Sequence, residues 1–193
     1  MPPELTARSV VAAAADYADT HSVETLSLFA IARELGVDAA EVERVVPTRD
    51  ALLSGVQTLA LAELGDRVEA ALADGAGDGR VRAIAESFRG YSRERPGRWR
   101  SLLRPLSEQA AADPDSRRIL RIMLDAMSAC GVPHADRVHA SRMTSALVVG
   151  FIRLEAAGIF DLRSPDAEDT WHRMIAVCEM FLREWPAPEP EPR

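Results

Sequence analysis

The chain has 193 residues, of which 47% are hydrophobic and 5% aromatic, a composition typical of a helical protein with a sizeable core. Its formal net charge is −7, and all 23 basic residues are arginine, so the overall charge does not favour a nucleic-acid-binding protein. We find no run of about 18 apolar residues, so we expect no contact with a membrane and a cytoplasmic protein.

Three short helices are predicted at the N-terminal end. Thr6 is placed to cap the first helix, which runs to about residue 20, while Ser27 and Asp38 cap the second and third. Gly36 lies where a helix C-terminus needs a positive φ, and Glu41 is spaced to complete a capping box with Asp38. Two helices joined by a tight turn containing glycine have the layout of a helix-turn-helix.

The rest of the chain also has helical periodicity. Thr48 caps a long fourth helix that reaches about Ala73, and the glycine-rich stretch 74–79 follows it as a flexible break. Five further helices are predicted to begin near residues 80, 96, 113, 134 and 164. Ser164 is the expected N-cap of the last one, with Pro165 in its first turn. The sequence therefore predicts an all-α fold of about nine helices.

No arrangement of residues indicates catalysis, a metal site or a bound cofactor. His134 and His139 are five residues apart, which does not align two ligands on one helix face. The segment GAGDG follows a helix and lacks the lysine of a phosphate-binding loop. We therefore expect neither an enzyme nor a cofactor.

The segment 80–104 is rich in arginine, with eight arginines and two glutamates. One interpretation is an anion-binding surface. The other is a solvated stripe opposite the apolar face of a helix, in which Glu86 pairs with Arg82 or Arg89. The helical register accounts for the stripe without a ligand.

Apolar and aromatic side chains recur in the C-terminal helices at spacings that allow two interpretations. They can line a cavity for a small molecule, because methionine and aromatic residues are common in adaptable pockets, or they can be ordinary core. The candidate pocket residues are Phe88, Trp99, Leu103, Met123, Met127 and Phe151.

Two long stretches resemble a known family. The N-terminal LTARSVVAAAADYAD and LSLFAIARELGVDAAEVERVVPTRDALL resemble the DNA-binding domain of the tetracycline-repressor (TetR) family. GYSRERPGRWRSLLRP, ALVVGFIRLEAAGIF and AEDTWHRMIAVCEMFL resemble the C-terminal domain of its WHG (Trp-His-Gly) subgroup. The resemblance implies an all-helical homodimer in which the first three helices bind operator DNA, the next hold a small effector and the last two dimerise.

The resemblance also suggests which residues would contact DNA. They are Ser27, Asp38, Ala39, Glu41, Val42, Glu43, Arg44, Thr48 and Arg49. The family's usual Leu-Tyr-x-His-Phe run is replaced here by Val42-Glu43-Arg44-Val45-Val46, and Glu43 would face phosphate with like charge. Residues 1–53 carry four arginines and nine acidic residues, so this segment has a formal charge of −5.

These observations lead to one expected organisation and two functional hypotheses. We expect a helix-turn-helix domain at 1–53, an effector-binding and dimerisation domain at 54–185 with the fourth helix as connector, and a disordered tail at 186–193. The leading hypothesis is a ligand-responsive transcriptional regulator acting as a repressor. The alternative is a helical dimer that has lost DNA binding and serves as a ligand-binding or protein-interaction module.

Overall fold

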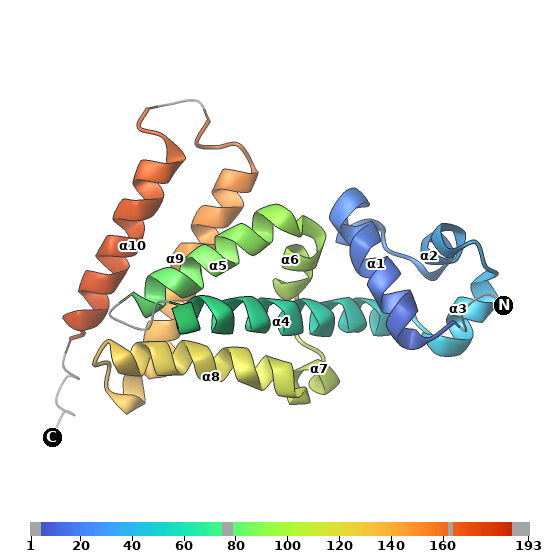
Figure 1. The fold of residues 1–193 in the computed structure, drawn as a ribbon, viewed down its shortest axis with the longest axis horizontal. Coiled ribbons are helices and arrows are strands. Elements are labelled where there is room, and N and C mark those ends of the chain that lie inside the picture. Colours follow the sequence, from blue (N-terminus) through green and yellow to red (C-terminus); the bar gives the residue numbers. More distant parts are fainter. Residues whose placement is uncertain (1–4, 75–78, 162–163, 187–193) are drawn as a thin grey trace, which may run out of the picture. The chain divides into compact units, whose positions relative to one another are not determined.

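The computed structural model describes residues 5–74, 79–161 and 164–186. Within these ranges the chain forms ten α-helices and two 3-10 helices and no strand, so the predicted all-α fold is confirmed (Figure 1). The elements are α1 (Ala7–His21), η1 (Val23–Thr25), α2 (Leu28–Leu35), α3 (Ala39–Val45), α4 (Arg49–Asp74), α5 (Arg80–Glu94), α6 (Pro96–Leu102), α7 (Glu108–Ala112), α8 (Pro114–Ala129), η2 (His134–Asp136), α9 (Arg137–Ala156) and α10 (Ala167–Arg183).

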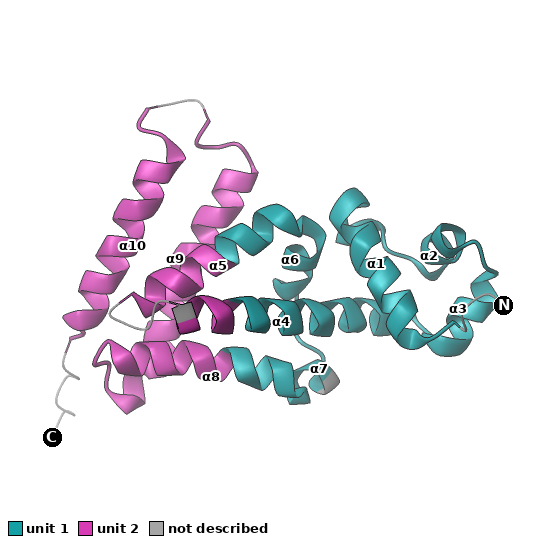
Figure 2. Cartoon of the chain, in the orientation of Figure 1, with its two compact units in different colours: residues 1–67, 88–119 teal, residues 68–87, 120–193 magenta. Residues whose placement is uncertain are grey.

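The structure contains two short helices, α7 and the 3-10 helix η1, that the sequence did not indicate. Most of the predicted glycine-rich break, residues 75–78, and the predicted tail from residue 187 lie outside the described residues. The chain divides into two compact units, which Figure 2 colours separately. Unit 1 comprises residues 1–67 and 88–119, and unit 2 comprises residues 68–87 and 120–193.

Local capping residues set most of the helix starts. The Thr6 hydroxyl accepts a hydrogen bond from the Ser9 amide at 3.1 Å, and Ser27 and Thr48 accept from amides three residues ahead. Gly36 ends α2 in the left-handed region with φ 67°. Each of these predicted caps is confirmed.

Two predicted caps are wrong. Asp38 stands at the N-cap position of α3, but its side chain makes no capping hydrogen bond. The Glu41 amide, which the Asp38 side chain would accept from in a capping box, donates at 3.0 Å to the backbone carbonyl of Asp38. The last helix is capped by Asp166 and not by Ser164, because the Asp166 carboxylate accepts from the Asp169 amide at 2.9 Å.

The first three helices and the start of α4 share one hydrophobic core. Its fully buried members include Val10, Ile31, Val42, Leu52 and Val56, which come from α1, α2, α3 and α4. Burial of this many aliphatic side chains, each contributing about 1.5–3 kcal/mol, holds the short helices in place. Within unit 1, this three-helix group (residues 5–46) is called the head below.

Helix α6 packs directly against α1 in unit 1. Gly97 lies so close to α1 that a Cβ at this position would overlap the carbonyl group of Ala18. Glycine is therefore required at position 97 for this packing. Pro96 occupies the first turn of α6, as predicted.

The next residue, Arg98, carries a buried guanidinium among carboxylates. Its Nη2 lies 2.6 Å from Asp16 and its Nη1 3.2 Å from Asp19, both on α1, and its Nε lies 3.7 Å from Glu63 on α4. Tyr91 donates a hydrogen bond to Glu63 at 2.7 Å, and burial raises the pKa of this phenol far above its usual range. The charges of α1, α4 and α6 are thus joined in one cluster.

The prediction of a solvated arginine stripe is wrong at two of the eight arginines. Arg98 is 5% exposed and Arg89 is 2% exposed, so neither is solvated. Arg82 and Glu86 also make contacts that the sequence did not indicate. In unit 2, Arg82 lies 3.6 Å from Glu179, and Glu86 accepts a hydrogen bond from Trp171 Nε1 at 2.6 Å.

Two glycines in unit 1 give arginine side chains room to cross a helix backbone. A Cβ at Gly90 would lie 2.5 Å from Arg67 Nη2, and a Cβ at Gly65 would lie 2.6 Å from the Nη2 of Arg118. Arg67 also binds both carboxylate oxygens of Glu94, at 2.7 and 2.8 Å. Neighbouring helices therefore approach each other through guanidinium groups as well as apolar side chains.

The charge cluster generates a prediction for stability. Replacing Arg98 by Met leaves Asp19, whose side chain is 9% exposed, as a buried carboxylate without its main counter-charge. We expect the free energy of unfolding to fall by about 3–5 kcal/mol, as found when one partner of a buried ion pair is removed. Chemical denaturation measures this change.

Arg100→Met is the matched control, because Arg100 is exposed and its nearest carboxylate, on Glu24, is 3.9 Å away. We expect it to cost less than about 1 kcal/mol. Adding Asp19→Asn to Arg98→Met removes the stranded charge and restores part of the loss. Equal effects of the two arginine variants contradict the structural role of Arg98.

Candidate functional site

Helix α3 presents a mixture of charged and small side chains to solvent. Asp38, Glu43 and Arg44 are exposed, whereas Ala39 and Glu41 are half-buried. Among the predicted DNA-contacting residues, Val42 is fully buried in the head core, so it positions α3 from beneath and offers no side chain to a partner. The exposed part of α3 is therefore short and carries both signs of charge.

Two of the predicted contact residues have hydroxyls engaged in capping. The Ser27 hydroxyl accepts from the Ala30 amide at 3.1 Å, and the Thr48 hydroxyl accepts from the Ala51 amide at 3.0 Å. Each hydroxyl retains its own proton, because it is an acceptor in the cap. Both residues stand at the first turn of a helix, α2 or α4, where backbone amides point outward.

Arg49 holds the head together through its side chain. Its Nε donates to the carbonyl of Leu26 at 2.7 Å, and its Nη2 donates to the carbonyl of Glu24 at 2.9 Å. These bonds tie the start of α4 to the segment between α1 and α2. Arg49, which was predicted to bind phosphate, thus also has a structural role. Only part of its guanidinium is left to bind a ligand.

Phe29 on α2 is 70% exposed, and it is not among the residues that the sequence indicated as candidates for a contact. Its neighbours Leu28, Ile31 and Ala32 face the head core, so Phe29 falls off the apolar stripe of the helix. The periodicity alone was sufficient to find it. Its ring is therefore accessible from solvent.

The six predicted pocket residues divide between the two units. Phe88 and Trp99, in unit 1, are buried and meet edge to face with ring centroids 5.7 Å apart, whereas Leu103 is 40% exposed. In unit 2, Met123, Met127 and Phe151 are buried. The effector pocket stays a prediction.

The described residues hold no cluster of three or more His, Cys, Asp or Glu side chains that suits a metal ion. None of the helices in this part of the chain is both long and apolar enough to cross a membrane.

In the described part of the chain, which is all-helical, the short helices α2 and α3 are joined at the left-handed Gly36, the layout of the helix-turn-helix class. Comparison with known proteins then narrows the class. Residues 81–178, about half of the chain, match the family described as tetracyclin repressor-like, C-terminal domain, and the chain belongs to this family.

One sequence relative is named as a regulator of the helix-turn-helix type. The HTH-type transcriptional regulator Rv1816 of Mycobacterium tuberculosis is 35% identical over 124 residues, covering 60% of this chain and 53% of that protein. The chain thus spans about half the length of the curated relative it matches.

Apo ActR from Streptomyces coelicolor superposes with a TM-score of 0.72 at 14% identity, over 95% of this chain and 97% of that one. A TetR variant from Acinetobacter baumannii, solved in complex with minocycline, gives a TM-score of 0.71 at 20% identity, over 95% and 99% of the two chains. At these identities the structural matches show the fold alone.

The contacts of Arg49 lead to a second prediction. We expect Arg49→Ala to lower the free energy of unfolding by about 1–2 kcal/mol, because two backbone carbonyls lose a charged donor. Arg44→Ala changes an exposed arginine on α3, and its free energy of unfolding should stay within about 0.5 kcal/mol of the parent value. Urea unfolding of both variants distinguishes them, and equal losses contradict a structural task for Arg49.

Proposed function

We propose that this protein is a dimeric transcriptional regulator that binds operator DNA through α2 and α3 and acts as a repressor released by a small-molecule effector. The observation that carries the proposal is the intact helix-turn-helix, with Gly36 at its turn and a closed core beneath it. Membership of the tetracyclin repressor-like family and the name of the relative Rv1816 support the same function.

Phosphate contact in this proposal rests on few cations. Arg33 and Arg44 are exposed on α2 and α3, and neither has an ion-pair partner among the described residues. Arg49 contributes the part of its guanidinium that the backbone carbonyls leave free. Two half-sites in a dimer double this small number, so we expect binding to be weak and strongly dependent on salt.

A second candidate function is a protein-interaction module with the same fold. The observation that favours it is the exposed surface of the helix-turn-helix, where Phe29 on α2 is 70% exposed and the carboxylates of Asp38 and Glu43 are exposed at the start of α3 and on it. A surface that exposes both an aromatic side chain and carboxylates suits a basic protein surface better than a phosphate backbone.

DNA binding is tested by selecting bound fragments from random DNA with purified protein at low and moderate salt. We expect enrichment of one sequence. Arg44→Ala should then weaken binding to all sequences alike and reduce the slope of log affinity against log salt by about one. Arg44 is preferred to Arg49 here, because its loss leaves the internal bonds of the head intact.

Glu43→Gln separates two roles of the acidic α3. If Glu43 only repels phosphate, the variant binds every sequence more tightly. If it accepts a hydrogen bond from a cytosine amino group, the variant loses affinity for the selected sequence alone. If neither the parent nor this variant binds DNA at low salt, the regulator proposal fails and the interaction module replaces it.

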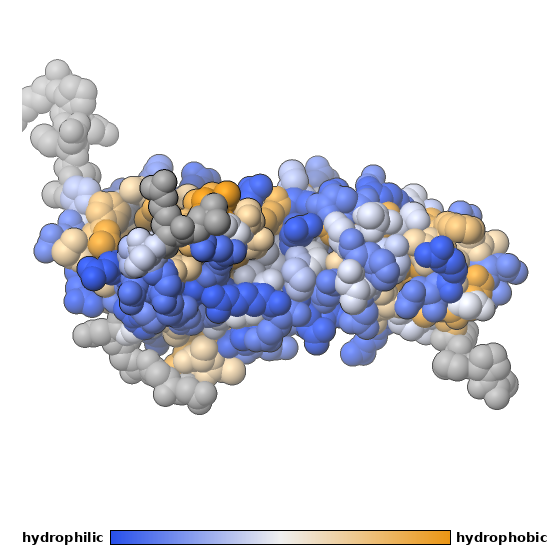
Figure 3. Space-filling model, turned by 90° about the horizontal axis from the view of Figure 1, so that it is seen from above, coloured by the Kyte–Doolittle hydropathy of each residue, from blue (hydrophilic) through white to orange (hydrophobic). Residues whose placement is uncertain are grey.

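The dimer interface is proposed on α9 and α10, which pack together in unit 2. These helices expose large apolar side chains that a single chain leaves in water. Figure 3 shows one face of the molecule, with hydrophobic areas in orange within a mostly hydrophilic surface. The residues are Val138, Met143, Leu147, Leu154, Val177, Met180 and Phe181. A two-fold pairing buries these faces against their own copies.

Leu147→Glu combined with Met180→Glu should place two charges in this interface. We expect the dimer Kd to rise at least about thirtyfold, as for the loss of an interface hot spot of about 2 kcal/mol. Light scattering across a concentration series measures the change. Leu120→Glu, at a leucine that is 55% exposed on α8, is the control and should leave the dimer intact. A parent protein that is monomeric at micromolar concentration refutes the interface.

A further inference from the structure

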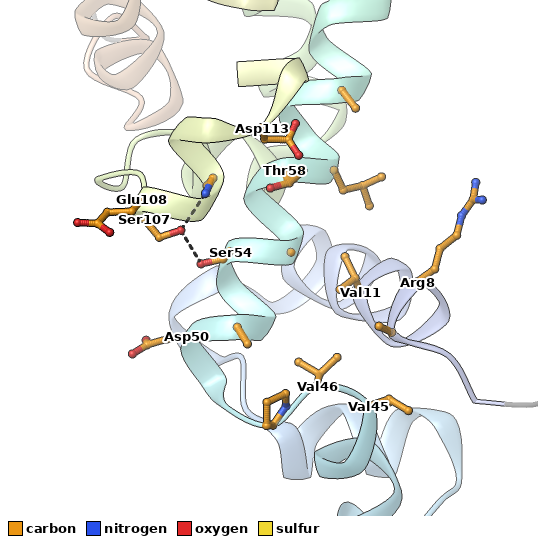
Figure 4. Close-up of a pocket in the computed structure, with 17 residues that line it drawn as sticks. Arg8, Val11, Val45, Val46, Asp50, Ser54, Thr58, Ser107, Glu108 and Asp113 are labelled. Atoms are coloured by element: carbon orange, nitrogen blue, oxygen red, sulfur yellow. Dashed lines mark hydrogen bonds between the residues drawn. The ribbon is translucent and has the colours of Figure 1, made fainter. Parts of the chain in front are cut away.

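Unit 1 contains a groove of about 1050 Å³ that the functions above do not use. The N-terminal half of α4 forms its floor, with the small or apolar residues Ala51, Gly55 and Leu59. One side is formed by α1 and the other by α7 (Figure 4). The segment that joins α3 to α4 also lines it, through Val45, Val46 and Pro47. The groove is large enough for a small molecule.

The charges around the groove are arranged unevenly. Asp50, Glu108 and Asp113 contribute three carboxylates, and Arg8 contributes one guanidinium. Figure 4 shows Asp50 and Glu108 on the α7 side of α4, with Arg8 on the α1 side. Within the described part of the chain, neither Asp50 nor Glu108 has an ion pair or a side-chain hydrogen bond of its own. Two free carboxylates therefore stand beside an apolar floor.

From this arrangement we infer that the groove between α1, α4 and α7 binds a small amphipathic cation. Its apolar body lies along α4 over Ala51, Gly55 and Leu59, and its positive charge faces Asp50 and Glu108. The apolar floor supplies affinity and the carboxylates select the charge. A carboxylate or phosphate ligand is disfavoured, because it meets three like charges and one opposite charge.

The bound cation would contact both the head and the rest of the groove, which α4 and α7 form. Val11 and Val46 of the head line the groove alongside α4 residues and Ser107, the N-cap of α7. The hydroxyls of Ser54 and Ser107, 3.5 Å apart, join α4 to α7 beside the groove. A bound cation therefore fixes α1 relative to α7, in addition to the contacts that α6 already makes with α1.

The test uses two probes of the same shape and opposite charge, tetraphenylphosphonium and tetraphenylborate, titrated into the full chain by calorimetry. We expect the phosphonium to bind with a Kd below about 1 mM and the borate to bind at least tenfold more weakly. Asp50→Asn with Glu108→Gln should weaken phosphonium binding about tenfold, because each carboxylate roughly 6 Å from a cation in water contributes about threefold.

Asp125→Asn with Glu184→Gln removes the same net charge from exposed positions outside the groove and should leave binding unchanged. Ala51→Trp fills the floor from an exposed position and should abolish binding, whereas Ala70→Trp, elsewhere on α4, should not. Ala7→Trp, on the α1 side, repeats the test if Ala51→Trp fails to fold. Equal binding of the two probes, binding that survives both filling variants, or no phosphonium binding at millimolar concentration overturns the inference.

Discussion

Helix α6 approaches α1 so closely that the backbone of Ala18 takes the space where a side chain at position 97 would begin. The adjacent Arg98 fixes the same contact through charge, because its guanidinium lies among Asp16, Asp19 and Glu63. Backbone contact sets the distance between the two helices and the ion pairs set their register. The head is therefore held by α6 as well as by the covalent link to α4.

A buried ionic cluster is a costly way to hold two helices together. Removing charges from water costs several kcal/mol, so such a cluster contributes less to stability than an apolar contact of the same size. Its geometric demands are stricter, however, since Arg98 must meet carboxylates from two helices at once. The arrangement therefore favours one packing of α1, α4 and α6 over alternatives in which these helices are shifted along their apolar faces.

Features set by neighbouring residues were predictable from the sequence, and features set by distant residues were not. The caps at Thr6 and Ser27 and the left-handed Gly36 depend on three or four consecutive positions. The burial of Arg98 depends on Asp16 and Asp19, about eighty positions earlier. Helical periodicity alone assigns every arginine to the solvent-exposed face, so it could not predict this burial. The groove along α4 escaped prediction for the same reason, because its residues come from α1, α4 and α7.

The absence of lysine from the chain determines how unit 1 responds to alkali. The hydrogen bond to Glu94 raises the pKa of Arg67, so this guanidinium keeps its proton at a pH where an ammonium, with a pKa near about 10.4, loses its charge. The hydrogen bond from Arg67 lowers the pKa of Glu94, so this pair adds stability above the ordinary glutamate pKa and loses it only as the pH falls. The contact between Arg67 and Glu94 therefore weakens in acid and persists in base.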